Sequence, residues 1–188
     1  MDYREYLARP LSLNFMDKLV QQIFMYPADL DIVYQLIFDQ DVKVAWRAAW
    51  TCQKISNSHP EWFTDIQFQQ LSTLAVSISH GGLLRGTLSI LNNLPIPGSV
   101  SVEFINACFD WMVSPKSPVS VQSISMKMLY RISTVEPDFK QELIATLENI
   151  DPGDYSAGFN CTRKKVLADL IQESTPKGVF VYAKTRRR

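Results

Sequence analysis

The sequence lacks the signatures of disulfide-stabilised, zinc-binding and membrane-spanning proteins. Its three cysteines, Cys52, Cys108 and Cys161, are odd in number and far apart, and none belongs to a CxxC or Cys/His spacing. Neither a disulfide framework nor a zinc site is therefore expected. No stretch contains the roughly eighteen uninterrupted apolar residues that a transmembrane helix needs. We expect a protein of a reducing compartment, the cytoplasm, with no membrane segment.

Motifs of catalysis and nucleotide binding are missing as well. The patterns HExxH, GxSxG and GxxxxGK[ST] do not occur, so no common hydrolase, metalloprotease or P-loop chemistry is indicated. His59 and His80 lie in the turn-like stretches SHPEW and SHGG, without a cysteine or carboxylate at ligand spacing. We interpret both histidines as surface residues and expect no catalytic residue, no metal and no cofactor.

Charge is balanced in total but uneven along the chain. The 188 residues have a formal net charge of zero, 46% hydrophobic and 20% charged residues, which is typical of one folded domain. Residues 1–154 carry 11 Lys and Arg against 17 Asp and Glu, whereas residues 155–188 carry 8 against 2. A zero total disfavours extensive contact with nucleic acid, but the basic C-terminal end leaves an anionic partner open.

Apolar residues recur with helical spacing along most of the chain, and strand-like alternation is nearly absent before the last ten residues. Proline- and glycine-containing separators, such as PIPGS and DPGDYSAG, divide these helical stretches. Because every connection is short, neighbouring helices should be antiparallel. The expected helices cover residues 12–25, 29–38, 41–56, 65–78, 82–94, 101–113, 118–134, 138–149 and 158–173.

Four of these helices align as a repeat with intervals of 39, 38 and 38 residues. Within each helix the aligned positions lie at i, i+4, i+8 and i+11, which form one stripe on a helix of 3.6 residues per turn. Such a stripe is buried when helix pairs stack on one another. The aligned sets are Val44, Leu83, Val121 and Phe159; Ala48, Thr87, Ser125 and Arg163; Cys52, Leu91, Leu129 and Leu167; and Ile55, Leu94, Ile132 and Leu170.

The segment DVKVAWRAAWTCQKI, residues 41–55, resembles the second helix of a HEAT or armadillo-type repeat. Asp41 stands at the turn, Val44 and Arg47 follow, and the small Ala48 and Ala49 would allow close helix approach. The resemblance covers about residues 12–173. It implies an all-α fold, a right-handed α-α superhelix of about four to five stacked helix pairs. We expect one domain over residues 1–173 and a basic C-terminal tail, with disorder as its default state, over residues 174–188.

In the family that the chain resembles, second helices line the concave surface. Positions at −2, +2 and +6 from the Ala48 set point away from the core, by the 100° rotation per helical residue. The first helices carry acidic residues instead: Asp29, Asp31, Asp39, Asp65, Glu103, Asp110, Glu142 and Glu148. We predict a binding face that is basic and aromatic. It consists of Lys43, Trp46, Trp50, Lys54, Arg85, Lys127, Tyr130, Arg131 and Lys165.

Two plainer interpretations of this face stay open. Lysine and arginine opposite an apolar stripe are often the solvated side of an amphipathic helix. Trp46 and Trp50 are also compatible with a structural role, packing on the helix at residues 12–25.

Three functions are compatible with these features. The leading hypothesis is a non-catalytic scaffold that binds a protein or peptide of anionic character on the concave face. The first alternative is a nucleic-acid-binding or DNA-repair module resembling the HEAT-like alkylpurine DNA glycosylases, for which Asp169 is a poor candidate catalytic aspartate. The tryptophan pair alone motivates a third, a small-ligand or regulatory enzyme subunit. The terminal GVFVYAKTRRR could add a strand to a partner or contact phosphate.

Overall fold

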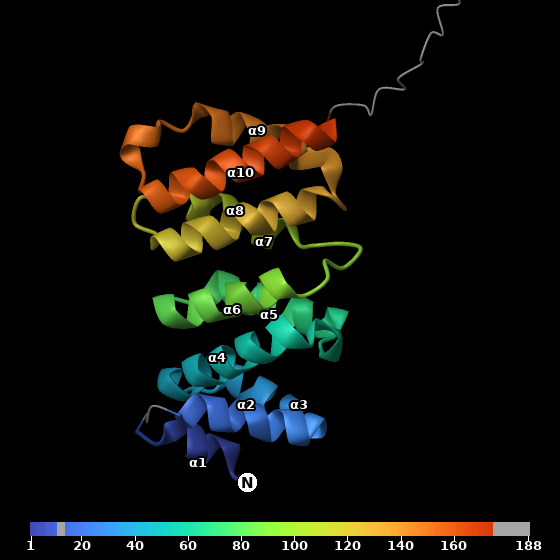
Figure 1. Cartoon of the computed structure of the whole chain (residues 1–188), viewed down its shortest axis with the longest axis vertical. Coiled ribbons are helices and arrows are strands. Elements are labelled where there is room, and N and C mark those ends of the chain that lie inside the picture. The colour runs from blue at the N-terminus through green and yellow to red at the C-terminus, as the bar shows by residue number, and fades with distance from the viewer. Residues whose placement is uncertain (11–13, 175–188) are drawn as a thin grey trace, which may run out of the picture.

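The computed structural model describes residues 1–10 and 14–174, and these residues form helices and turns without a strand among them. None of these helices has the length and apolar character of a bilayer-spanning segment. Ten α-helices follow one another along the described chain (Figure 1): α1 Tyr3–Ala8, α2 Phe15–Met25, α3 Leu30–Gln35, α4 Val42–Ser58, α5 Asp65–Ser77, α6 Gly81–Asn93, α7 Val102–Val113, α8 Val119–Ser133, α9 Lys140–Asn149 and α10 Ala157–Ser174.

The all-helical prediction is confirmed, and each of the nine expected helices has a counterpart. Two of them are flanked by short 3-10 turns. In the expected helix 29–38, η1, Pro27–Asp29, precedes α3 and η2, Leu36–Phe38, continues it; in the expected helix 138–149, η4, Pro137–Phe139, leads into α9. The helix α1 was not expected. The predicted tail begins at Ser174, the last residue of α10, and the rest of it lies outside the described residues.

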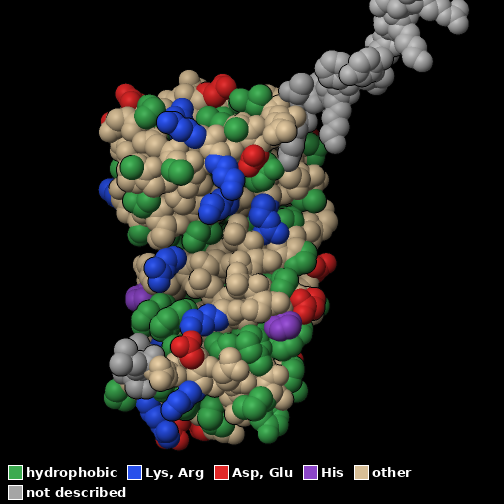
Figure 2. All heavy atoms as spheres, viewed as in Figure 1, with side chains coloured by type: hydrophobic (Ala, Val, Ile, Leu, Met, Phe, Trp, Pro, Cys, Tyr) green, Lys and Arg blue, Asp and Glu red, His purple; other side chains and the backbone are tan. Residues whose placement is uncertain are grey.

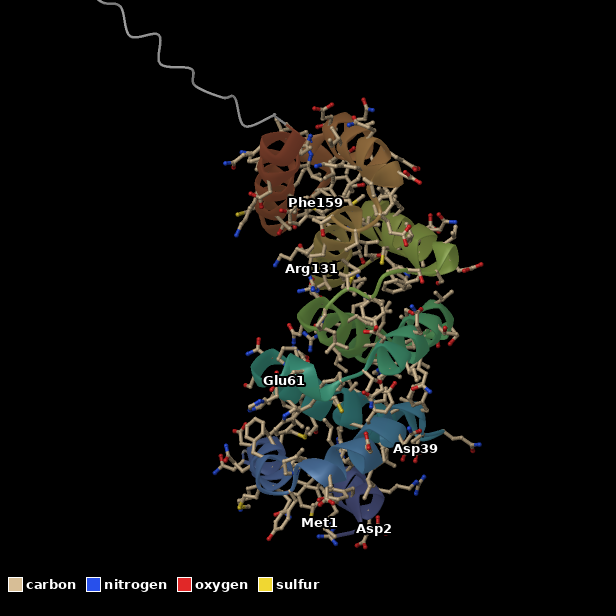
Figure 3. The ribbon with its side chains drawn as sticks, turned by 90° about the vertical axis from the view of Figure 1, so that its right-hand side faces the viewer. Met1, Asp2, Asp39, Glu61, Arg131 and Phe159 are labelled. Atoms are coloured by element: carbon tan, nitrogen blue, oxygen red, sulfur yellow. The ribbon has the colours of Figure 1, made fainter. Side chains whose placement is uncertain are left out.

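The helices form a two-layer stack. The second helices α4, α6, α8 and α10 pack on one another in order, and the first helices α5 and α7 pack on each other in the second layer. Figure 1 shows the second helices in front, rising from α4 to α10, and Figure 3 shows both layers edge-on. Four helix pairs, α3/α4, α5/α6, α7/α8 and α9/α10, thus follow the N-terminal α1 and α2.

The aligned positions of the repeat form the contact between second helices. The sets headed by Val44 and Ile55 are buried in every repeat, with exposed fractions of 6% or less. Leu91 and Leu129 are fully buried, and Leu167, in the last pair, is partly buried against the core. The 38- or 39-residue period therefore describes the packing of the molecule as well as its sequence.

Side-chain caps define where several helices begin. The Asp41 carboxylate accepts from the N–H of Lys43 at the start of α4, as its position at the turn suggested. Thr64 and Gln67 form a capping box at α5, and Ser101 caps α7. The ring of His80 accepts from the N–H of Leu83 at the start of α6. Each cap satisfies backbone N–H groups that have no partner within the helix.

Tertiary contacts hold α1 in place. The Tyr3 hydroxyl donates to Asp29, and burial, reinforced by this carboxylate, raises the pKa of Tyr3 to about 12. Arg4 pairs with Asp39 at 2.7 Å, and this ion pair lowers the pKa of the Asp39 carboxyl. Because α1 has only six residues, it is too short to be stable alone. Its partners lie more than twenty residues away in the sequence. The helical spacing of nearby apolar residues therefore could not predict this helix.

Small side chains bring α4 and α6 close together. Gly86 faces Ala49, and a β-carbon on Gly86 would lie 3.3 Å from Ala49 Cβ. The predicted role of Ala49 in close approach thus has a matching glycine on the neighbouring helix. Both residues are buried, so the pair leaves little space for a larger side chain.

We predict that Gly86→Val lowers the free energy of unfolding by about 1–3 kcal/mol, because the branched side chain overpacks the α4–α6 contact. Gly81→Ala is the matched control, since a β-carbon on Gly81 meets nothing within 4 Å. We expect it to change stability by less than about 0.5 kcal/mol. Urea unfolding followed by circular dichroism measures both, and equal stabilities would contradict this account of the contact.

Candidate functional site

The predicted binding residues lie on the outward side of α4, α6, α8 and α10, which we call the second-helix face. None of the nine is buried. Lys43, Arg85, Lys127 and Lys165 are exposed, whereas Trp46, Trp50, Lys54, Tyr130 and Arg131 are partly exposed. Figure 2 shows Lys and Arg side chains recurring along this face with few acidic side chains among them.

Two adjoining grooves cross the second-helix face. The amide groove has a volume of about 380 Å³, and the lysine groove has a volume of about 460 Å³. Asn92 lines both, so the two grooves meet at the end of α6. The amide groove is lined by Gln53, Lys54, Asn57, Ser89, Asn92, Asn93 and Ile124. The lysine groove is lined by Asn92, Lys127, Tyr130, Arg131, Cys161, Thr162, Lys165, Val166 and Asp169.

The lysine groove unites four predicted residues: Lys127, Tyr130, Arg131 and Lys165. Lys127 and Lys165 lie 38 residues apart, at the same position in successive repeats. Among the described residues neither lysine forms an ion pair. The groove therefore presents two ammonium groups to solvent, and Asp169 is the one acid among the described residues that line it.

Arg131 has a structural task. Its guanidinium donates to the backbone oxygens of Leu91, Asn92 and Leu94, the last at 2.6 Å. These oxygens lie at the C-terminal end of α6, where carbonyl groups lack partners within the helix and the helix dipole favours a cation. Burial lowers the pKa of Arg131. Figure 3 shows Arg131 in the second-helix layer.

Two other arginines of second helices act in the same way. Arg47 of α4 donates to the carbonyls of Leu7 and Arg9, both at 2.6 Å, at the end of α1. Arg163 of α10 donates to the carbonyls of Leu147 and Glu148 at the end of α9. Sequence reasoning missed this use of arginine. Arg163 could have indicated it, because its aligned set otherwise contains the small, uncharged residues Ala48, Thr87 and Ser125.

The tryptophans form a ladder along α4. The rings of Trp46 and Trp50 are stacked, with centroids 6.2 Å apart. A β-carbon on Gly82 would lie 3.1 Å from Trp46 Nε1, so Trp46 covers the start of α6. Lys54 Nζ lies 5.6 Å from the Trp50 ring centroid and pairs with Asp17 of α2. Lys54 thus connects the tryptophan pair to α2, and its positive charge is already neutralised by Asp17.

The acidic residues predicted for the first helices lie in that layer. Asp29 and Asp39 bind α1, as described above, and the other six are exposed. Figure 3 shows Asp39 on the side of the first helices. The two layers thus differ in the sign of their unpaired charges. This separation makes the second-helix face attractive to anions.

Reactive and metal-binding groups are sparse in the described part of the chain. No cluster of three or more His, Cys, Asp and Glu side chains suited to a metal ion occurs there. Cys52 and Cys108 are buried, and desolvation raises the pKa of both thiols. These two cysteines are therefore poor nucleophiles. Cys161 is exposed, within the lysine groove.

We predict that Arg131→Ala lowers the free energy of unfolding by about 2 kcal/mol, because charged hydrogen bonds to α6 carbonyls are lost. Lys127→Ala on the same helix is the control. Its side chain is exposed and unpaired, so we expect a change within about 0.5 kcal/mol. Chemical unfolding of the two variants beside the wild type provides the measurement. Equal stabilities would remove the capping role from Arg131.

Comparison with known proteins agrees with the stacked helix pairs. The sequence matches the HEAT repeat domain over residues 3–170. No curated protein and no solved structure gives a significant match. The match covers three helix pairs completely, most of the fourth, and nearly all of the described residues. The chain belongs to the HEAT repeat domain family.

Proposed function

We propose that this protein is a non-catalytic interaction scaffold that binds an acidic segment of a partner protein. The segment lies in the lysine and amide grooves of the second-helix face, which we take to be the concave surface. The observation that carries the proposal is the lysine groove, where the unpaired Lys127 and Lys165 line one cavity of about 460 Å³. A carboxylate-bearing segment would neutralise this pair.

The junction of the two grooves supports a peptide as the ligand. The side-chain oxygen of Asn92 is buried, and no described residue donates a hydrogen bond to it. A buried acceptor without a donor costs free energy, and a ligand N–H group would recover it once rotation of the Asn92 side chain turned the oxygen into the groove. Amide side chains also accept from and donate to peptide backbone. The amide groove therefore complements a peptide beside the charged lysine groove.

A rigid face favours such binding. The second helices pack continuously from α4 to α10, and three arginines tie second helices to the ends of other helices. A surface that is ordered before binding loses little conformational entropy when the ligand arrives. The unpaired thiols Cys52, Cys108 and Cys161 are compatible with action in the cytoplasm, which we propose as the compartment.

Duplex DNA is the second candidate ligand. Asp169, the residue that a glycosylase-like reaction would use, shares the lysine groove with Lys127 and Lys165. Strong binding to DNA requires several phosphate contacts. Arg131 and Lys54 already have partners, so few cations remain for phosphate groups. We therefore favour the protein partner.

Affinity capture from lysate of the source cells, followed by mass spectrometry, tests the proposal. We predict that the variant Lys127→Glu/Lys165→Glu captures at least tenfold less of the partner than the wild type does, because both charges in the groove are reversed. Lys18→Glu/Lys116→Glu makes the same change in net charge at two exposed lysines outside the grooves and should retain the partner. Purified partner should then bind the wild type directly in a titration.

Two results would overturn the scaffold assignment. Equal capture by both double variants would remove the lysine groove from binding. The DNA alternative would be established by three results together. The wild type binds duplex DNA at low salt, Lys127→Glu/Lys165→Glu does not, and the wild type captures no partner protein.

A further inference from the structure

A groove also opens on the opposite side of the molecule, in the first-helix layer. This first-helix groove lies between the end of α3 with η2 and the length of α5, and its volume is about 710 Å³. Most of its accessible lining is apolar. It is lined by Gln35, Phe38, Ile66, Gln69, Gln70, Thr73, Leu74 and Ser77.

The groove follows from the unequal lengths of two neighbouring first helices. The helix α3 has six residues before it tightens into η2, whereas α5 has 13. The Tyr34 hydroxyl bridges the two helices by donating to Gln70 Oε1 at 2.9 Å. Beyond this bridge the apolar side chains are uncovered. Ile66 is 71% exposed and Phe38 is 40% exposed, which is a large apolar area to leave in water.

The charges near this groove are negative. Of the residues that the structure describes, no Lys or Arg lines it. The exposed Asp65 precedes Ile66, and Asp31 Oδ1 lies 3.5 Å from Gln67 Nε2 at the same end of α5. Neither carboxylate forms an ion pair among the described residues. The matching ligand is therefore a segment with apolar side chains and a basic flank.

The chain itself contains a segment of this chemistry. Residues 178–188, GVFVYAKTRRR, lie outside the described residues. In an extended conformation Phe180 and Tyr182 would share one side, because alternate residues of a strand face the same way. Residues 184–188 then supply one lysine and three arginines.

The distance along the stack favours a segment from another molecule. The helix α10 ends at Ser174, and α8 and α6 lie between α10 and the level of the groove. Packed helices are about 8–10 Å apart, so Phe180 would have to travel roughly 25 Å or more from Ser174, including the crossing between layers. Six residues span at most about 20 Å. Phe180 therefore does not reach the groove of its own chain.

We propose that residues 178–188 of a second copy of this chain dock in the first-helix groove. Phe180 and Tyr182 cover Ile66 and Phe38, and the arginines lie near Asp31 and Asp65. The resulting self-association uses the face opposite to the partner-binding grooves. A self-associated scaffold would present several second-helix faces and gain avidity for a multivalent partner.

Sedimentation equilibrium of the full chain between about 1 µM and about 1 mM tests this docking. We predict a self-association that Ile66→Lys weakens at least tenfold, because the change removes apolar area and repels the basic segment. Phe180→Ser should weaken it to a similar extent, and circular dichroism of this variant checks that its helix content equals that of the wild type. Val102→Lys is the matched control, since Val102 is 65% exposed on the first helix α7, outside the groove.

The expected result is a wild type and a Val102→Lys variant with the same dissociation constant, and two weakened variants. A wild type that stays monomeric up to about 1 mM overturns the proposal, whether or not the segment contacts its own chain. Self-association that is unchanged by Phe180→Ser, or weakened equally by Val102→Lys, overturns it too. None of these outcomes bears on capture of an acidic partner at Lys127 and Lys165.

Discussion

The structure depends on the burial of one apolar stripe per second helix against the next second helix. A single helix pair cannot remove this stripe from water, so each pair is stable only in contact with its neighbours. The contact between α4 and α6 shows how closely the helices must approach, with Gly86 against Ala49. Fully buried leucines such as Leu91 and Leu129 continue the same contact along the stack.

Stacking also determines where charge is available. Since the stripe directs each second helix inward on one side, its opposite side must face solvent, and the four second helices together make one continuous surface. Lys127 and Lys165 come into the same groove because the repeat places them at equivalent positions of adjacent helices. The first helices have their own outward side, which carries exposed carboxylates. The separation of charge is therefore a consequence of the two-layer architecture.

Two groups of cations on the second helices have different tasks. Arg47, Arg131 and Arg163 donate to carbonyls at helix ends, where the guanidinium satisfies several acceptors at once. Among the described residues no such acceptor meets Lys127 or Lys165, and both ammonium groups are exposed for a ligand. These three arginines thus stabilise the stack, while Lys127 and Lys165 carry the proposed recognition. Substitutions of the two groups should accordingly affect different properties, stability and binding.

The sequence by itself determined the helices, their pairing and the direction of each second helix, because burial follows a 3.6-residue period that is written within each helix. All nine residues of the predicted face are accordingly at least partly exposed, although Trp46, Trp50 and Tyr130 also pack against the core. Only the tertiary structure decided that α1 forms, that Arg131 is occupied by the end of α6, and that grooves open at Asn92 and beside Ile66. These features depend on atoms that meet across about 30 to 40 residues of chain. The spacing of apolar residues within one helix does not predict which distant side chains meet or how much space remains between them.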